Sequence, residues 1–122
     1  MKEDLICTRF VNYLKSLISV KQQKVDNLIY FHIPNGGSRK SSIEGYKFKL
    51  MGVLPGVPDY QFIWKKNGET KFGFIEFKTE KGRQSESQKQ FEADCLDVGA
   101  PYAIARSSDQ GIQILKDWGV LK

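Results

Sequence analysis

Residues 57–78 read VPDYQFIWKKNGETKFGFIEFK, and this stretch decides the fold of the chain. Asn67-Gly68 is the strongest short-range signal for a two-residue type I′ turn between antiparallel strands. Strand-forming residues flank it on both sides, over 60–64 and 71–78. With Asn67 and Gly68 at the centre of the turn, Lys66 faces Glu69, and counting back along both strands places Asp59 opposite Glu76. The sequence therefore predicts a β-hairpin with a defined register.

The predicted register brings three charged side chains together at one end of the hairpin. Directly opposed residues such as Asp59 and Glu76 have Cβ atoms about 4.5–5.5 Å apart. Lys78 shares a face with Glu76 because side chains alternate with a period of two. Two carboxylates this close repel each other at a cost of roughly 1 kcal/mol or more unless positive charge lies between them. Lys78 offers one such charge, and a hard divalent cation such as Mg²⁺ offers two.

An exposed cluster of ion pairs is the ordinary interpretation of such a trio, but the neighbouring residues favour a site in the core. Both predicted faces of the hairpin are apolar, one with Ile63, Phe72 and Phe74 and the other with Tyr60, Phe62, Trp64, Ile75 and Phe77. A strand that is apolar on both faces is typical of the buried centre of a sheet. The charged patch is therefore predicted at the end of a core sheet, which is a functional location.

The composition is that of a globular domain with a polyanionic partner. The chain has 122 residues, of which 40% are hydrophobic and 27% charged, so a single domain with a sizeable core is expected. The formal net charge of +5 favours binding to nucleic acid. The chain has two cysteines, which form no CxxC motif, and one histidine. This content does not favour a zinc site or a disulfide framework. No apolar run has transmembrane length, so a cytoplasmic protein without membrane contact is expected.

The segments around the hairpin complete an α/β pattern. Helices are expected over 3–21, 39–51, 85–98 and about 107–118, and further strands over 28–33 and 101–105. Ser85 is a plausible N-cap and Gly99 a C-terminal stop for the third helix, and either Ser107 or Ser108 is expected to cap the last one. This order fits one domain with a small mixed sheet of three or four strands and helices on both faces.

Two loops have the chemistry of contacts to a nucleic-acid backbone. Asn35-Gly36-Gly37 can present main-chain N–H groups close to a phosphate, and basic side chains can hold the backbone electrostatically. These basic side chains are Arg39, Lys40, Lys81 and Arg83. Beside a carboxylate pair that suits a divalent cation, such loops indicate hydrolysis of a phosphodiester: the cation would lower the pKa of its water, and Lys78 would stabilise developing oxyanion charge.

Several short motifs resemble the VRR-NUC family, the virus-type replication-repair nucleases of the PD-(D/E)xK superfamily. Pro58-Asp59 and Glu76-Phe77-Lys78 match the superfamily signature. The further matches are HIPNGG (32–37), GVLPGVPD (52–59), EFKTEKGR (76–83), SESQ (85–88) and ARS (105–107). The resemblance extends over nearly all of residues 1–122 and implies a restriction-endonuclease-like core. A stand-alone copy this short is similar to phage and bacterial members, which look like Holliday-junction resolvases and tend to form homodimers.

Carried over residue by residue, the resemblance implies a role for each motif position. Asp59 and Glu76 would ligate Mg²⁺ or Mn²⁺ together with the main-chain carbonyl of Phe77, and Lys78 would position or activate the attacking water. Gln88 matches the family's helix glutamine near the metal or the scissile strand. The family also carries an acidic residue on its first helix. Spacing points to Glu3, and the adjacent Asp4 stays open as the alternative.

The sequence thus predicts a metal-dependent DNA endonuclease that is selective for branched DNA such as a Holliday junction. It would act as a homodimer in the cytoplasm of a bacterial or phage-infected cell. Two alternatives stay open at this point. One is a non-catalytic basic DNA-binding module with a structural acidic cluster, and the other is a sequence-specific restriction-type endonuclease that cuts linear duplex at a fixed site.

Overall fold

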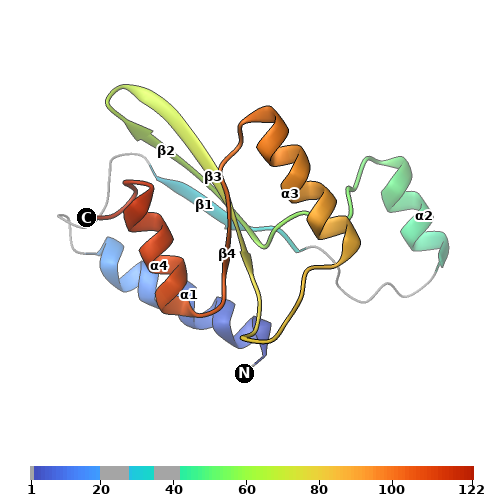
Figure 1. Cartoon of the computed structure of the whole chain (residues 1–122), viewed down its shortest axis with the longest axis horizontal. Helices are drawn as coiled ribbons and strands as arrows, with labels where there is room; N and C mark the ends of the chain where they lie inside the picture. The colour runs from blue at the N-terminus through green and yellow to red at the C-terminus, as the bar shows by residue number, and fades with distance from the viewer. Residues whose placement is uncertain (1, 20–27, 35–41) are drawn as a thin grey trace.

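The computed structural model describes residues 2–19, 28–34 and 42–122, and its backbone is drawn in Figure 1. Within these residues the elements follow the predicted order. They are α1 (Glu3–Ile18), β1 (Ile29–His32), α2 (Ser42–Leu50), β2 (Tyr60–Lys66), β3 (Glu69–Phe77), α3 (Glu86–Val98), β4 (Tyr102–Ala105) and α4 (Ser108–Asp117). The expected extensions of the first helix over 20–21 and of the second over 39–41 lie outside the described residues.

The β2–β3 hairpin has the predicted register. Asn67 and Gly68 have φ values of 53° and 79°, the positive values that a type I′ turn requires. Lys66 pairs with Glu69, and the ladder continues to Tyr60 opposite Ile75. The next step along both strands brings Asp59 to Glu76, as the turn dipeptide predicts.

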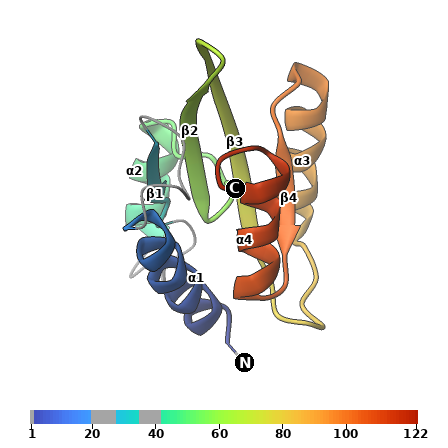
Figure 2. The ribbon, with the colours of Figure 1, turned by 90° about the vertical axis from the view of Figure 1, so that its left-hand side faces the viewer.

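The hairpin lies at the centre of a mixed four-stranded sheet in the order β1-β2-β3-β4. β1 pairs with β2 and β2 with β3 in antiparallel orientation, whereas β4 is parallel to β3. Helix α3 makes the crossover that a parallel pair needs. Figure 2 shows α1 and α4 on one side of the sheet and α3 beside β4.

One face of the sheet forms the core together with α1 and α4. The side chains of Phe10, Leu14, Phe62, Ile75 and Phe77 are completely buried there. The ring of Phe10 lies 4.8 Å from that of Phe77, measured between centroids. Hydrophobic burial of this kind contributes about 1.5–3 kcal/mol for each large side chain. The helices thereby hold the end of β3, where Glu76 and Phe77 alternate between the two faces.

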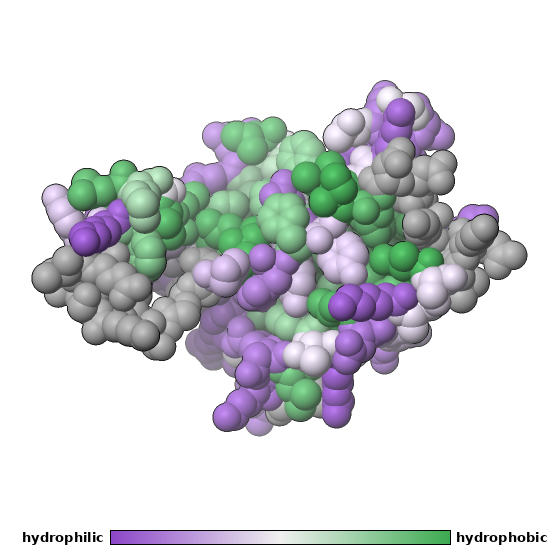
Figure 3. Space-filling view, turned by 180° about the vertical axis from the view of Figure 1, so that it is seen from behind, coloured by the Kyte–Doolittle hydropathy of each residue, from purple (hydrophilic) through white to green (hydrophobic). Residues whose placement is uncertain are grey.

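The prediction that the hairpin is buried on both faces is wrong for its outer part. On the second face, α3 covers Phe74, whose ring is 5.4 Å from that of Phe91. Further out, Phe72 is 43% exposed, and Ile29 and Phe31 of β1 are exposed as well. Figure 3, which views the protein from behind, shows hydrophobic residues at the surface near the middle of the view. A short α3 cannot cover all four strands, and strand periodicity alone carries no information on the length of a covering helix.

The caps of α3 and α4 match the predicted signals. The side chain of Ser85 accepts a hydrogen bond from the N–H of Gln88, and Gly99 ends the helix with a φ of 81°. Of the two serines considered for α4, Ser107 is the N-cap. Among the described residues, no helix is long and apolar enough to span a membrane.

Gly56 holds the loop before β2 against the start of α3. Its φ is +83°, and a Cβ placed on it would lie 2.7 Å from the main-chain nitrogen of Gln88 and closer still to the carbonyl of Ser87. Both neighbours are backbone atoms, which cannot turn aside. The loop that leads into Asp59 therefore depends on glycine at this position for its close approach to α3.

Gly56→Ala is expected to lower the free energy of unfolding by about 3 kcal/mol or more, because overpacking adds to the backbone cost of positive φ. Gly52→Ala is the matched control, since Gly52 also has a positive φ (+93°) but has nothing within 4 Å of its Cβ position. The control is expected to lose only about 1–2 kcal/mol. Urea unfolding of both variants measures the difference. Equal losses would show that α3 does not constrain the loop.

Candidate active site

The predicted trio of Asp59, Glu76 and Lys78 lies together at one end of the central strands. Glu76 is the next-to-last residue of β3, and Lys78 follows the strand. Both are buried, with only 2% of Glu76 and 7% of Lys78 exposed, and Asp59 directly before β2 is half-buried. The carboxyl ends of the parallel strands β3 and β4 meet here, since the N–H of Lys78 donates to the carbonyl of Ala105. In α/β sheets this edge is where ligands bind.

Asp59 is fixed by hydrogen bonds to both neighbouring strands. Its Oδ2 accepts a hydrogen bond of 2.7 Å from the main-chain N–H of Phe77. Its main-chain carbonyl accepts another of 2.7 Å from the N–H of Ile33, just after β1. A residue fixed through both its side chain and its main chain loses little further freedom when it binds a ligand. The hairpin thus presents Asp59 in one orientation beside Glu76.

Glu76 lies in surroundings that favour its protonated form. Burial raises its pKa to about 9, with hydrogen bonding to Asp59 and the charge of Asp59 acting in the same direction. The charge of Lys78 lowers the pKa, and that of Glu3 raises it slightly. Within the described part of the chain, the buried Oε1 of Glu76 has no hydrogen-bond partner. A buried acceptor without a partner costs about 1–3 kcal/mol, so this atom is available to a ligand.

A cavity of about 370 Å³ connects this end of the hairpin with the first turns of α1. Its lining comprises Glu3, Asp4, Cys7, Thr8, His32, Asp59 and Tyr60. Both candidate acids of the first helix therefore line the same cavity as Asp59, and the charge of Glu3 also raises the pKa of Glu76. Burial raises the pKa of the Cys7 thiol to about 12, with Asp59 contributing, so the thiol stays neutral. His32 is exposed on β1, with its ring 5.1 Å from that of Tyr60.

The chemistry of the site fits a hard divalent cation bound largely by substrate and water. Among the described residues, no group of three or more His, Cys, Asp or Glu side chains forms a complete metal cage. Mg²⁺ does not need one, because it is usually held by one or two carboxylates and keeps several waters or phosphate oxygens. The unpartnered Oε1 of Glu76 and the fixed carboxylate of Asp59 are donors of that kind.

Gln88 caps a helix beside the site. Its Oε1 accepts a hydrogen bond of 2.8 Å from the N–H of Ser85, which completes a capping box at the start of α3. Because Gly56 packs against the same turn, Gln88 lies next to the loop that carries Asp59. The described contacts therefore show a capping role for Gln88. Its predicted catalytic role stays a prediction.

The basic side chains predicted to bind DNA lie in two segments. Lys81 and Arg83 are exposed on the loop that follows Lys78. The other predicted contacts, Asn35, Gly36, Gly37, Arg39 and Lys40, lie outside the described residues. Of the predicted DNA surface, the structure therefore describes the loop after Lys78 and its position relative to the carboxyl groups of Asp59 and Glu76.

Three further residues belong to this region although their sequence patterns predicted no role in the site. They are Cys7, Tyr60 and Arg106. Cys7 and Tyr60 line the cavity beside Asp59. Arg106, at the end of β4, donates from Nη1 to the carbonyls of Thr79 and Gly82 at 2.8 and 2.7 Å. The available signals were the position of Cys7 one turn after Glu3 and the ARS motif at 105–107.

A mixed sheet with acidic and lysine side chains at one end of its central strands is consistent with a nuclease core. Residues 20–109 match the model of the VRR-NUC domain, and the chain belongs to this family. Membership implies a nuclease-type function in DNA processing, as the motifs predict. Neither the curated proteins nor the solved structures gave a significant match. Helix α1, with Glu3, and most of α4 lie outside the matched residues.

Proposed function

We propose that this protein is a metal-dependent DNA endonuclease that hydrolyses phosphodiester bonds. The observation that carries the proposal is the contact of half-buried Asp59 with buried Glu76 beside Lys78, in a chain of the VRR-NUC family. A structural ion-pair cluster explains the trio less well, because burial raises the pKa of Glu76 and its Oε1 has no hydrogen-bond partner among the described residues. Buried groups in such a state are typical of functional sites.

Asp59 and Glu76, with the main-chain carbonyl of Phe77, would hold Mg²⁺ or Mn²⁺. The bound ion supplies Lewis acidity and a water of lowered pKa. Glu76 must lose its proton to become a ligand, so occupation of the site releases a proton. Glu3 on α1 is the candidate for a further carboxylate because it lines the same cavity and its charge acts on Glu76.

The remaining side chains would bind DNA or stabilise charge during the reaction. Lys78 would orient the attacking water and stabilise negative charge that develops on the phosphate, since a fixed charge in a buried site needs no reorganisation. Lys81 and Arg83 would hold the DNA backbone beside the site. Gln88, at the start of α3, would support the scissile strand from the other side of the loop that carries Asp59.

Branched DNA, such as a Holliday junction, is the proposed substrate, and a homodimer is the proposed active species. The resemblance to short phage and bacterial family members supports both. Two-fold symmetric substrates suit two-fold symmetric proteins. The exposed apolar residues Ile29, Phe31 and Phe72 are compatible with a protein interface. Light scattering of the purified protein tests the assembly.

A cleavage screen over linear duplex, flapped and four-way-junction DNA tests the function. With Mg²⁺ or Mn²⁺ the junction is expected to be cut faster than the linear duplex of the same sequence, and a chelator should stop all cleavage. Cutting of linear duplex at one fixed sequence would instead indicate a restriction-type enzyme. Binding of DNA without cleavage under any metal would indicate a DNA-binding module.

A further inference from the structure

Arg106 occupies a rigid position at the edge of the candidate active site. It follows the last residue of β4, where the carbonyl of Ala105 accepts a hydrogen bond from Lys78. Its own main-chain N–H donates to Oε1 of Gln110, 2.7 Å away, in the first turn of α4. The guanidinium thus projects from a junction fixed to both the central sheet and α4.

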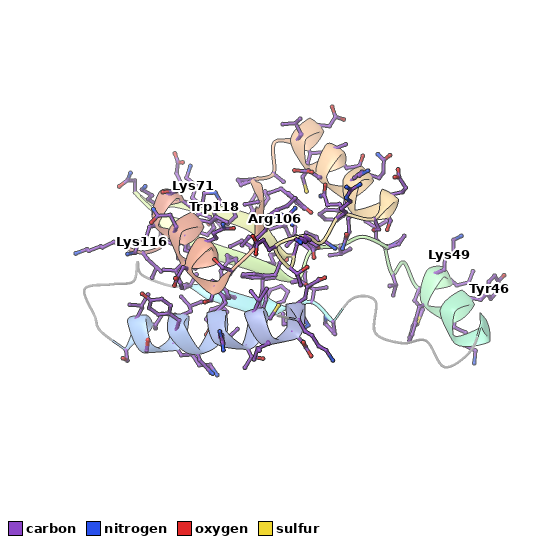
Figure 4. The ribbon with its side chains drawn as sticks, turned by 60° about the horizontal axis from the view of Figure 1, so that its bottom comes forward. Tyr46, Lys49, Lys71, Arg106, Lys116 and Trp118 are labelled. Carbon is purple, nitrogen blue, oxygen red and sulfur yellow. The ribbon has the colours of Figure 1, made fainter. Side chains whose placement is uncertain are left out.

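The guanidinium holds the turn that carries Lys81. Nη1 donates to the carbonyls of Thr79 at 2.8 Å, Glu80 at 3.3 Å and Gly82 at 2.7 Å. The turn is closed on itself by the N–H of Gly82, which donates to the carbonyl of Thr79 at 3.1 Å. Figure 4 shows Arg106 beside this loop. Hydrogen bonds from a charged donor are stronger than those from a neutral one, so these contacts favour one conformation of the short loop.

The charge of Arg106 is not used in an ion pair within the described residues. The acceptors that it contacts there are neutral main-chain carbonyls, and none of the described ion pairs includes it. A buried or half-buried arginine of purely structural type is usually paired with a carboxylate. Here its donors instead fix the backbone on either side of Lys81 and directly before Arg83, whose side chains are exposed.

We propose that Arg106 is a positioning residue for DNA binding: it holds the turn of residues 79–82 so that Lys81 and Arg83 face the DNA backbone. The proposal rests on the proposed function and assigns Arg106 an action through the turn, with no contact of its own to DNA. An ordered loop loses less conformational freedom on binding, so bracing increases affinity without a new contact.

A double-mutant cycle on DNA affinity tests this role. The proteins are the unaltered chain, Arg106→Met, Lys81→Gln/Arg83→Gln and the combined triple variant, and the probe is a labelled four-way junction bound in the presence of a chelator. Removing two phosphate contacts should weaken binding roughly tenfold to a hundredfold at 0.1 M salt and lower the salt slope by about 1.8. Arg106→Met should weaken binding by a comparable factor. In the Lys81→Gln/Arg83→Gln background it should change affinity less than twofold.

Two further measurements distinguish an effect of Arg106 on the turn of residues 79–82 from an effect of net charge. Hydrogen exchange at the amide of Gly82 should accelerate in Arg106→Met, because the turn opens more often. Lys15→Met, which removes one exposed charge in the last turn of α1, is the matched control for net charge and should change affinity less than Arg106→Met. If Arg106→Met does not fold, Arg106→Gln keeps a donor at the same junction and enters the cycle in its place.

The outcomes distinguish this role from the proposed function. An additive cycle, with Arg106→Met still costing its full factor in the triple variant, would overturn the role of Arg106 by showing a direct contact. Unchanged affinity and unchanged exchange at Gly82 would also overturn it. Absence of DNA binding by the unaltered chain would overturn the proposed function itself.

Discussion

Replacing Glu76 by glutamine is expected to lower the rate of DNA cleavage about a thousandfold or more, since a metal ligand in such a site contributes several kcal/mol. Glutamine keeps the size of the side chain but cannot supply the anionic oxygen. A cleavage assay on four-way-junction DNA with Mg²⁺ or Mn²⁺ measures the loss. A Glu76→Gln protein that cuts at the unaltered rate would defeat the assignment of Glu76 as a ligand.

The same variant should change how stability depends on pH in metal-free protein. The pKa of Glu76 is about 9 in the folded chain against an ordinary value of 4.5. Between these values the folded state binds one more proton than the unfolded state, so stability falls as pH rises through the window. Glutamine does not titrate, and Glu76→Gln should therefore lose this part of the pH dependence. Each unit of pKa shift corresponds to about 1.4 kcal/mol.

Thermal melts at pH 5, 7 and 9, with a chelator or with Mn²⁺, measure this effect. The rise in melting temperature that Mn²⁺ causes in the unaltered protein should increase with pH, because the Glu76 carboxyl must be deprotonated to bind the ion. In Glu76→Gln, Mn²⁺ should raise the melting temperature little. Glu69→Gln is the matched control, since its carboxylate is 72% exposed at the other end of the same strand. Glu69→Gln should have the melting temperature and the DNA cleavage rate of the unaltered protein.

Lys78→Met is expected to lower the cleavage rate about a hundredfold to a thousandfold, the usual loss when one charge-stabilising donor is removed. Methionine suits a position that is 7% exposed, so the fold should persist. The charge of Lys78 lowers the pKa of Glu76, and its removal should therefore make Glu76 harder to ionise. Metal binding should weaken modestly at neutral pH and recover at higher pH, in contrast to Glu76→Gln.

Metal titration at pH 7 and 9 and the cleavage assay test this second variant. Lys71→Met is the control, because Lys71 is an exposed lysine of the same strand, paired with Glu69 at the far end of the hairpin. It should retain cleavage. Loss of metal binding in Lys78→Met at both pH values would show that the lysine is required for the site itself, beyond its charge.

The parts of the fold that were predictable from sequence rest on local chemistry. Asn67-Gly68 determines the turn type, and the turn type determines which residues of β2 and β3 pair. Ser85 and Gly99 mark the ends of α3 because a side-chain acceptor and a left-handed residue are what helix ends require. The encounter of Asp59 with Glu76 follows from the same register.

The parts that were not predictable depend on how distant segments pack. Phe72 and Ile29 are exposed because α3 is too short to cover them. The alternation of residues along a strand carries no information on the length of a covering helix. Cys7 reaches the site only because α1 docks with its first turns at the end of the hairpin. The bonds from Arg106 to the turn span more than twenty residues of sequence and follow from the parallel pairing of β3 with β4.

The register of the β2–β3 hairpin also links the proposed active site to correct folding. A slip of one residue in the pairing would exchange the faces of all side chains on the slipped strand. On β3, Ile75 and Phe77 would leave the core at the same moment as Glu76 left its place beside Asp59. A mispaired chain would then lose stability together with the carboxylate pair. A folded but inactive population is therefore disfavoured, and specific activity should follow the folded fraction.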